Sequence, residues 1–421
     1  MEAMYSFTTL GAVIGLALAI LLIIRKVHPA YSLILGALVG GIIGGGGLTT
    51  TVNTMVSGAQ SMMSSVLRIM TSGILAGALI KTGSAQKIAE TIVSKLGQKK
   101  AALAIAVATM IICAVGVFVD IAVITVAPIA LAIGKEADIP KESLLLAMIG
   151  GGKAGNIISP NPNTIAASEA FGVDLTALMM KNAVPALCAL AMTVLLASML
   201  GRKGTLGVSE SDIDDTNQEL PGFLQAILGP VVVIILLALR PIAGIAIDPL
   251  IALPVGGLLC TVVTGNAKKV VEFTEFGLSK VVGVSVLLIG TGTIAGIIKA
   301  SALQYDVINV LEALHMPAFV LAPLAGILMA GATASTTAGV TIASQTFAPT
   351  LLAEGVPALA SAAMIHAGAT VVDSLPHGSF FHATGGSVNM SIGDHMKLIP
   401  FEACVGLTST IVSVLLYMLL G

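Results

Sequence analysis

Long apolar stretches separated by short polar ones run through the whole chain. Six of them lie at about 9–25, 29–46, 61–82, 101–134, 143–170 and 175–200. Six more lie at about 221–240, 244–264, 281–300, 317–350, 357–386 and 396–420. Because a helix needs about 20 mostly apolar residues to cross a bilayer, this pattern predicts an all-α polytopic membrane protein.

The composition supports the same class of protein. The chain has 421 residues, of which 56% are hydrophobic and 10% charged, whereas soluble domains carry about 25% charged residues. The one long polar stretch, residues 201–220, is typical of a solvated linker. There is no basic stretch with interleaved aromatic residues, so we expect a lipid bilayer and no nucleic acid as a partner.

The two halves of the chain resemble each other. Residues 73–85 (GILAGALIKTGSA) match residues 292–302 (GTIAGIIKASA) with a small gap. Residues 148–160 match residues 364–376 at a constant offset of 216. Internal duplication is common in secondary transporters. We therefore predict two repeats, residues 1–200 and 221–421, joined by the linker at 201–220.

Segments 101–134 and 317–350 are too long for one crossing, and each has small or polar residues at its centre. We interpret both as re-entrant hairpins, so that each repeat has five crossings and one hairpin. Because five is odd, the repeats would be inverted relative to each other. This topology places fifteen Lys and Arg residues in the cytoplasm and three outside, in agreement with the positive-inside rule. It predicts an inner-membrane protein with an outside N-terminus and a cytoplasmic linker.

Two segments contain residues that interrupt a helix. The stretch SPNPNT (159–164) holds two prolines, and SLPHGS (374–379) lies in the matching segment of the second half. Irregular backbone at membrane depth is tolerated only where it is buried in protein or lines a cavity. We therefore predict broken helices at 143–170 and 357–386. Their half-helix N-termini suit an anionic group such as a carboxylate, although the prolines could instead only kink helices for packing.

Polar side chains gather at the breaks and hairpin tips, where we expect the substrate to bind. The candidates are Lys153, Asn156, Ser159, Asn161, Asn163, Thr164, Ser335, Thr336, Ser374, His377, Gly378 and Ser379. A lysine within a membrane span is by default a functional residue. Lys153 could bind the substrate carboxylate, replace a coupling cation, or pair with Asp120 or Asp373. The hydroxyls of Ser335 and Thr336 could instead join neighbouring helices.

Asp120, Asp373 and His377 are candidates for ion or proton coupling. A carboxylate buried away from water is protonated more readily and can carry a proton through a transport cycle. His366, His377 and His382 contain no i, i+4 pair, so the spacing favours hydrogen bonding or proton relay over a metal site. The sequence offers no convincing nucleophile–base or metal constellation, and we expect neither an enzyme nor a cofactor.

At these motifs the chain resembles the gluconate:proton symporter (GntP-type permease) family of the ion-transporter superfamily. The resemblance is carried by FVDIAVITVAPIALAI (118–133), GGGKAGNIISPNPNTIA (150–166), VVDSLPHGSFFHATGGSVNMSI (371–392) and KLIPFEACVGLTSTIVSVLLY (397–417). It implies an elevator-type transporter with a dimerising scaffold, a moving transport part and proton-coupled uptake of a sugar acid or hydroxy-monocarboxylate.

The first broken helix departs from the family pattern. Gluconate carriers have a His/Pro-rich sequence there, whereas this chain has Lys153, Asn156 and SPNPNT. The substrate could therefore be glycerate, lactate, 3-hydroxybutyrate or a larger anion. We predict a homodimeric importer of a small organic anion coupled to protons. The alternatives are a sodium-coupled carboxylate symporter and a cation/proton antiporter.

Overall fold

The computed structural model describes residues 6–97, 100–212, 219–313, 316–376 and 378–420. Within these ranges the chain forms helices and no strand, apart from one isolated β-bridge between Phe7 and Ser301. Four helical stretches are long and apolar enough to cross a membrane, namely Met63–Lys81, Ala183–Lys203, Ala267–Lys299 and Ile392–Leu420. The all-helical, multi-pass prediction is therefore confirmed.

The helices follow the predicted segments closely. In the first half they are α1 (Thr9–Ile24), α2 (Pro29–Ile43), α3 (Gly47–Gln60), α4 (Met63–Lys81), α5 (Ser84–Leu96), α6 (Ala101–Ala114), α7 (Val119–Glu136), α8 (Lys141–Asn156), α9 (Pro162–Phe171), α10 (Leu175–Lys181) and α11 (Ala183–Lys203). In the second half they are α12 (Phe223–Ala243), α13 (Pro249–Val263), α14 (Val270–Lys299), α15 (Leu303–Ala313), α16 (Leu321–Thr333), α17 (Thr336–Ala353), α18 (Ala358–Gly368), α19 (Ser379–Ser387), α20 (Ile392–Met396) and α21 (Ile399–Leu420).

Two helices differ from the hydrophobicity pattern. Helix α3 was not predicted, because Gly47–Gln60 is rich in Thr and Ser and buries few of its side chains, among them Thr51 and Met55. Helix α14 begins at Val270 and not near residue 281, because its first three turns contain glutamate and lysine as well as apolar residues. Polar residues in a helix lower the hydropathy of a segment without preventing the helix, so both features were hidden in the sequence.

The order of elements repeats in the two halves. A long helix and a short one (α4 and α5, or α14 and α15) precede a helix pair (α6–α7, or α16–α17), and a broken helix follows (α8–α9, or α18–α19). The turn of the first pair contains Gly116 with φ of 109°, and that of the second contains Ala334 with φ of 46°. Both tips thus use left-handed backbone, which reverses the chain within a few residues.

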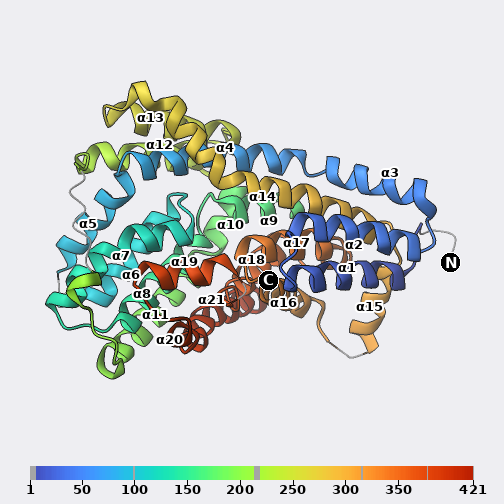
Figure 1. Cartoon of the computed structure of the whole chain (residues 1–421). Helices are drawn as coiled ribbons and strands as arrows, with labels where there is room; N and C mark the ends of the chain where they lie inside the picture. The colour runs from blue at the N-terminus through green and yellow to red at the C-terminus, as the bar shows by residue number, and fades with distance from the viewer. Residues whose placement is uncertain (1–5, 98–99, 213–218, 314–315, 377, 421) are drawn as a thin grey trace.

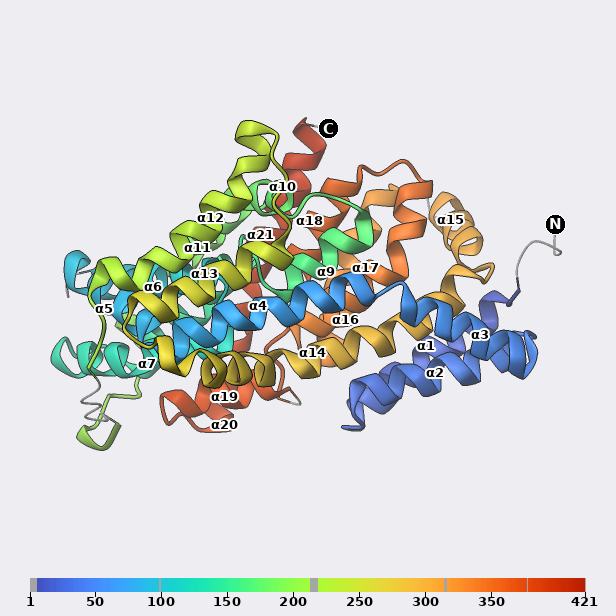
Figure 2. The same cartoon turned by 90° about the horizontal axis from the view of Figure 1, so that it is seen from above.

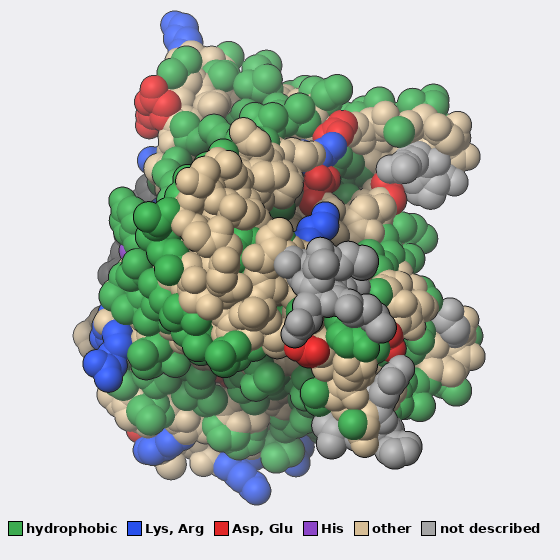
Figure 3. Space-filling view, turned by 90° about the vertical axis from the view of Figure 1, so that its right-hand side faces the viewer, with side chains coloured by type: hydrophobic (Ala, Val, Ile, Leu, Met, Phe, Trp, Pro, Cys, Tyr) green, Lys and Arg blue, Asp and Glu red, His purple; other side chains and the backbone are tan. Residues whose placement is uncertain are grey.

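Helix α14 and the α3–α4 stretch lie side by side along the length of the molecule (Figures 1 and 2). Elements α5 to α8 gather at one end, and α1, α2 and α15 at the other. Glycines let the two long elements touch: a Cβ on Gly277 would lie 1.9 Å from the carbonyl oxygen of Gly73. Small residues commonly allow such close approach between membrane helices. Hydrophobic side chains cover broad areas of the face shown in Figure 3.

The glycines of α8 also allow a close approach between helices. A Cβ on Gly151 would lie 2.1 Å from the carbonyl oxygen of Ala106, and one on Gly155 would lie 2.2 Å from that of Met110. In the second half, a Cβ on Gly368 would lie 2.5 Å from the carbonyl oxygen of Pro323. Each broken helix therefore packs closely against the first helix of its neighbouring pair, which fixes the break beside the hairpin tip.

The described residues of the linker, 201–212 and 219–220, are mostly exposed, and their first part is anchored to the start of α8. The Glu142 carboxylate accepts hydrogen bonds from the backbone N–H groups of Thr205 and Leu206. Lys141 Nζ lies 2.8 Å from Oδ1 of the buried Asp212. Burial alone would raise the pKa of Asp212, but hydrogen bonds from Lys141 and its other partners outweigh this and hold the pKa well below its ordinary value.

Candidate transport site

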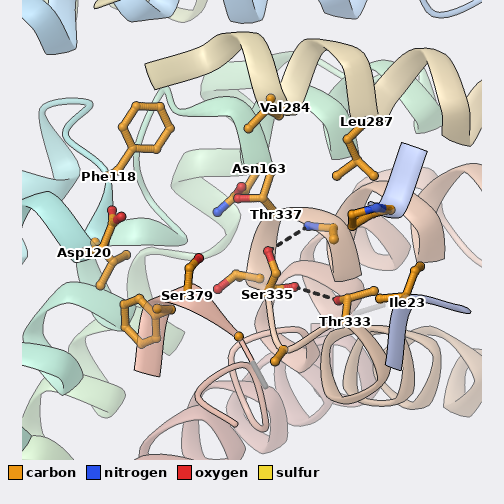
Figure 4. Close-up of a pocket in the computed structure, with 18 of the residues that line it drawn as sticks. Ile23, Phe118, Asp120, Asn163, Val284, Leu287, Thr333, Ser335, Thr337 and Ser379 are labelled. Atoms are coloured by element: carbon orange, nitrogen blue, oxygen red, sulfur yellow. Dashed lines mark hydrogen bonds between the residues drawn. The ribbon is translucent and has the colours of Figure 1, made fainter. Parts of the chain in front are cut away.

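A cavity of about 760 Å³ lies where the two helix pairs and the two broken helices meet. One wall consists of the starts of α7, α17 and α19 together with Asn156 and Asn163. The opposite wall consists of the α1–α2 connection and the middle of α14. Figure 4 shows Asp120, Asn163, Ser335 and Ser379 around this space, with Val284 and Leu287 of α14 across from them. A polar surface therefore faces one that combines apolar side chains with Lys26, His28 and Lys280.

Four helices begin at the cavity. Residues of the first turns of α7, α9, α17 and α19 line it, namely Asp120, Asn163, Thr336 and Ser379. A helix start exposes N–H groups without intrahelical partners and carries partial positive charge. The starts of α9 and α17 are capped by the side chains of Asn161 and Ser335, whereas the residues preceding α7 and α19 provide no side-chain cap. At α7, however, the Ile121 N–H donates to the Asp120 carboxylate at 2.9 Å, so the start of α19 is the one available to an anion.

Three asparagines hold the first break. The Asn161 side-chain oxygen caps α9 by accepting from the N–H groups of Asn163 (3.0 Å) and Thr164 (3.1 Å). Asn163 Nδ2 donates to Asn156 Oδ1 at 3.0 Å, and the Asn161 amide also donates to it. Among the described residues, Asn156 Nδ2 and Asn163 Oδ1 are buried without a hydrogen-bond partner. Both residues line the cavity, although these two atoms are themselves buried.

A buried ion pair links the first broken helix to the second break. Lys153 Nζ lies 2.7 Å from Asp373 Oδ1 and also donates to the carbonyl oxygen of Thr370 at 2.7 Å. Asp373 Oδ2 accepts from the Thr336 hydroxyl at 2.6 Å, and its other oxygen accepts from Ser374. Thr336 lines the cavity, whereas neither Lys153 nor Asp373 does. The ion pair therefore stands directly behind the cavity wall.

The family model of the GntP family permeases matches residues 7–420 of this chain. The chain belongs to the GntP permease family. An uncharacterized transporter of Haemophilus influenzae is 53% identical over 98% of this chain and 99% of its own length. A high-affinity gluconate transporter of Escherichia coli is 25% identical over 58% of this chain and 55% of its own. The D-serine transporter DsdX of the same species is 22% identical over 80% of this chain and 82% of its own.

Solved structures show the same fold. The YdaH transporter of Alcanivorax borkumensis aligns with a TM-score of 0.66 and 15% identity over 97% of this chain and 98% of its own. The MtrF efflux pump of Neisseria gonorrhoeae aligns with a TM-score of 0.66 and 16% identity over 90% and 85%, respectively. The permease is thus a transporter and not an enzyme, and the predicted family resemblance is confirmed.

The structure divides the predicted site residues of the permease into two layers. Those that line the cavity are Asp120, Asn156, Asn163, Ser335, Thr336, Gly378 and Ser379. Those that are buried outside its lining are Lys153, Ser159, Asn161, Thr164, Asp373 and Ser374. His377 lies outside the described residues. Of the three roles considered for Lys153, the ion pair with Asp373 is the one for which the structure contains the contact.

Three basic residues of the cavity were missed by sequence reasoning. Lys26 and His28 of the α1–α2 connection and Lys280 of α14 line the wall opposite the helix starts, and all three are exposed. From the sequence, the two lysines indicated only the orientation of the chain in the membrane. Nothing in their local pattern indicated that α1, α2 and α14 would face the broken helices. They make the open side of the cavity attractive to an anion.

Proposed function

We propose that the permease imports a small organic anion, a gluconate-like sugar acid or a hydroxy-monocarboxylate, together with protons. The observation that supports this most directly is the meeting of four helix starts at one cavity. Such a site attracts a carboxylate through backbone N–H groups and aligned peptide dipoles. The names of its relatives agree, since gluconate and D-serine both carry a carboxylate and at least one hydroxyl.

In the proposed binding mode the substrate carboxylate lies at the uncapped start of α19, away from the Asp120 carboxylate that occupies the start of α7. Asn163, Ser335 and Ser379 hydrogen-bond to the substrate hydroxyls from the polar wall. Asp120 also faces the cavity and can accept a hydrogen bond from a hydroxyl. Lys153 does not touch the substrate in this proposal. It neutralises Asp373 and thereby fixes Thr336 at the cavity wall.

We further propose inverted repeats, residues 1–200 and 221–421, and an elevator movement. The scaffold would comprise α1 to α4 and α12 to α14, and the two helix pairs with the broken helices would move against it. With the α1–α2 connection in the cytoplasm, as the distribution of lysines favours, the cavity opens inward. The resemblance to the family also implies a homodimer in the inner membrane, which mass photometry of the purified protein would test.

The decisive experiment starts with a thermal-shift screen of purified protein against gluconate, glycerate, lactate and 3-hydroxybutyrate. A stabilising carboxylate is then offered to proteoliposomes under a pH gradient, with sodium replaced by choline in parallel samples. We expect accumulation that requires the pH gradient and continues without sodium. Accumulation that requires sodium would replace proton symport by sodium symport. Failure of every carboxylate to stabilise the protein would refute the proposed substrate class.

A further inference from the structure

A second pair of titratable side chains is buried behind the cavity. His395 of α20 and Glu402 of α21 are 1% and 0% exposed, and His395 Nε2 lies 3.1 Å from Glu402 Oε1. The His395 ring stacks on Phe381 of α19 with 4.0 Å between ring centroids. Lys153 Nζ approaches the carbonyl oxygen of Glu402 at 3.4 Å. This acid–imidazole pair therefore adjoins the Lys153–Asp373 ion pair.

We propose that the Glu402–His395 pair is the site that binds the coupling proton. This inference rests on the proposed proton symport and moves the proton away from Asp373. A neutral imidazole and a carboxylate together carry one negative charge, so one added proton makes the pair neutral and a second gives it one positive charge.

The hydrogen bonds decide between the buried acids. Both oxygens of Asp373 already have partners, namely Lys153, Thr336 and Ser374. Glu402 Oε2 and His395 Nδ1, by contrast, have no hydrogen-bond partner among the described residues. A proton can therefore be added to Glu402 Oε2 without breaking an existing contact. Protonating Asp373 would leave the Lys153 charge unpaired in the interior.

Charge balance would couple binding of the anion to binding of the proton. The Lys153–Asp373 pair is neutral, and the singly protonated Glu402–His395 pair is neutral as well. An anion entering the cavity adds one negative charge near these groups, and in a medium of low dielectric constant this favours uptake of one proton. Thr336 lines the cavity and donates to Asp373, and Lys153, the partner of Asp373, approaches the carbonyl oxygen of Glu402. Carboxylate and proton would therefore bind together and leave together.

The other charged side chains near the pair either have an ion-pair partner of their own or lie at the surface. On α20, Asp394 and Lys397 pair with each other at the surface with 2.8 Å between Lys Nζ and Asp Oδ1. Helix α18 packs against α21 and carries the buried His366, while α19 carries the exposed His382. Helix α11, which also packs against α21, ends in the exposed Arg202 and Lys203. Helix α20 has five residues and carries both Asp394 and His395, so the acid of the surface ion pair and the buried imidazole lie on the same short helix.

The test compares two readouts in proteoliposomes loaded with the carboxylate that stabilises the protein most in the thermal-shift screen. Exchange of labelled for unlabelled substrate needs no net proton movement, whereas accumulation under a pH gradient does. For Glu402→Gln, which keeps the acceptor for His395, we expect exchange within about twofold of wild type and at least a tenfold loss of accumulation. Glu272→Gln, at an exposed position of α14, should retain both activities.

Wild-type accumulation by Glu402→Gln would overturn the assignment. So would loss of exchange in a folded Glu402→Gln protein, because the pair would then serve structure or substrate binding. If Glu402→Gln does not fold, His395→Gln is measured with the same readouts and the same expectations. If wild type exchanges the carboxylate but does not accumulate it under a pH gradient, the proposed proton symport itself fails, and the two failures are thus distinguishable.

Discussion

Lys153 of α8 and Asp373 of the second helix break form a buried ion pair, with 2.7 Å between Lys153 Nζ and Asp373 Oδ1. The pair joins the two halves of the chain behind the cavity. Because Thr336 donates to the same carboxylate at 2.6 Å, the pair also positions one residue of the substrate wall. It explains a lysine in a membrane span without requiring that the lysine bind substrate.

Replacing Lys153 by alanine should therefore destabilise the protein as well as abolish carboxylate uptake. Removal of one partner leaves an uncompensated buried charge, which costs about 3–5 kcal/mol. Replacing both partners by apolar residues removes that charge, so Lys153→Met with Asp373→Leu should regain most of the lost thermal stability but no uptake. Thermal unfolding in detergent measures both variants. A double variant as unstable as Lys153→Ala would contradict this account.

Asn163→Asp should weaken substrate binding strongly. Asn163 lines the cavity at the start of α9, and a new carboxylate there would repel an anionic substrate. About 1.4 kcal/mol of repulsion already weakens affinity about tenfold. Titration of the stabilising carboxylate by thermal shift or calorimetry gives the dissociation constant.

The matched control for this change is Gln225→Glu at the exposed start of α12. It makes the same amide-to-carboxylate exchange away from the cavity and keeps the acceptor for the Gly222 N–H. Its affinity should equal that of wild type. Unchanged affinity in Asn163→Asp would remove Asn163 from the proposed site.

An ion-pair cluster joins the proposed scaffold to the proposed moving part. Arg68 of α4 binds Asp248 through two nitrogens, at 2.9 and 2.6 Å, and Glu169 of α9 at 2.8 Å. In the expected topology this cluster lies on the outer side and must open when α9 moves. A partly exposed pair contributes about 0.5–1 kcal/mol, so Glu169→Gln should favour the outward-open state about two- to fivefold.

Cysteine labelling from outside measures that shift. Ser379→Cys is placed on the cavity wall in a background without the four native cysteines, and an impermeant maleimide is added to right-side-out vesicles. Glu169→Gln should increase the labelling rate, and Glu272→Gln should not. Equal rates in all three backgrounds would show that the Arg68–Glu169 contact does not govern outside access.

Asp212 gives a prediction with a defined pH dependence. Hydrogen bonds from Lys141, Ser209 and Asn389 overcome its burial and lower its pKa in the folded protein. The resulting stabilisation is present above the ordinary aspartate pKa of about 4 and is lost as the pH falls toward the lower folded value. Asp212→Asn should cost about 1–3 kcal/mol near pH 7. The difference in thermal stability from wild type should shrink near pH 3, and a constant difference would exclude ionisation as its source.

The sequence alone determined most of the helices, the two breaks and about half of the polar residues that line the cavity. These follow from local physics, because apolar length sets a membrane helix and the prolines of SPNPNT cannot continue one. The repeated order of elements followed from the matching segments 148–160 and 364–376. The polar helix α3 escaped prediction, since its sequence carries no strong apolar periodicity.

Only the tertiary structure decided which of these residues face the same space. Lys153 and Asp373 are neighbours because α8 packs beside the second break, and the sequence could not choose between Asp120 and Asp373 as the partner of the lysine. The packing of distant helices also places Lys26 and Lys280 at the cavity. It places Glu402 and His395 next to each other behind the cavity. Helix packing depends on the shape of small-residue surfaces such as Gly151 against Ala106. Whether two such surfaces fit depends on both helices, so it cannot be read from the sequence of either helix alone.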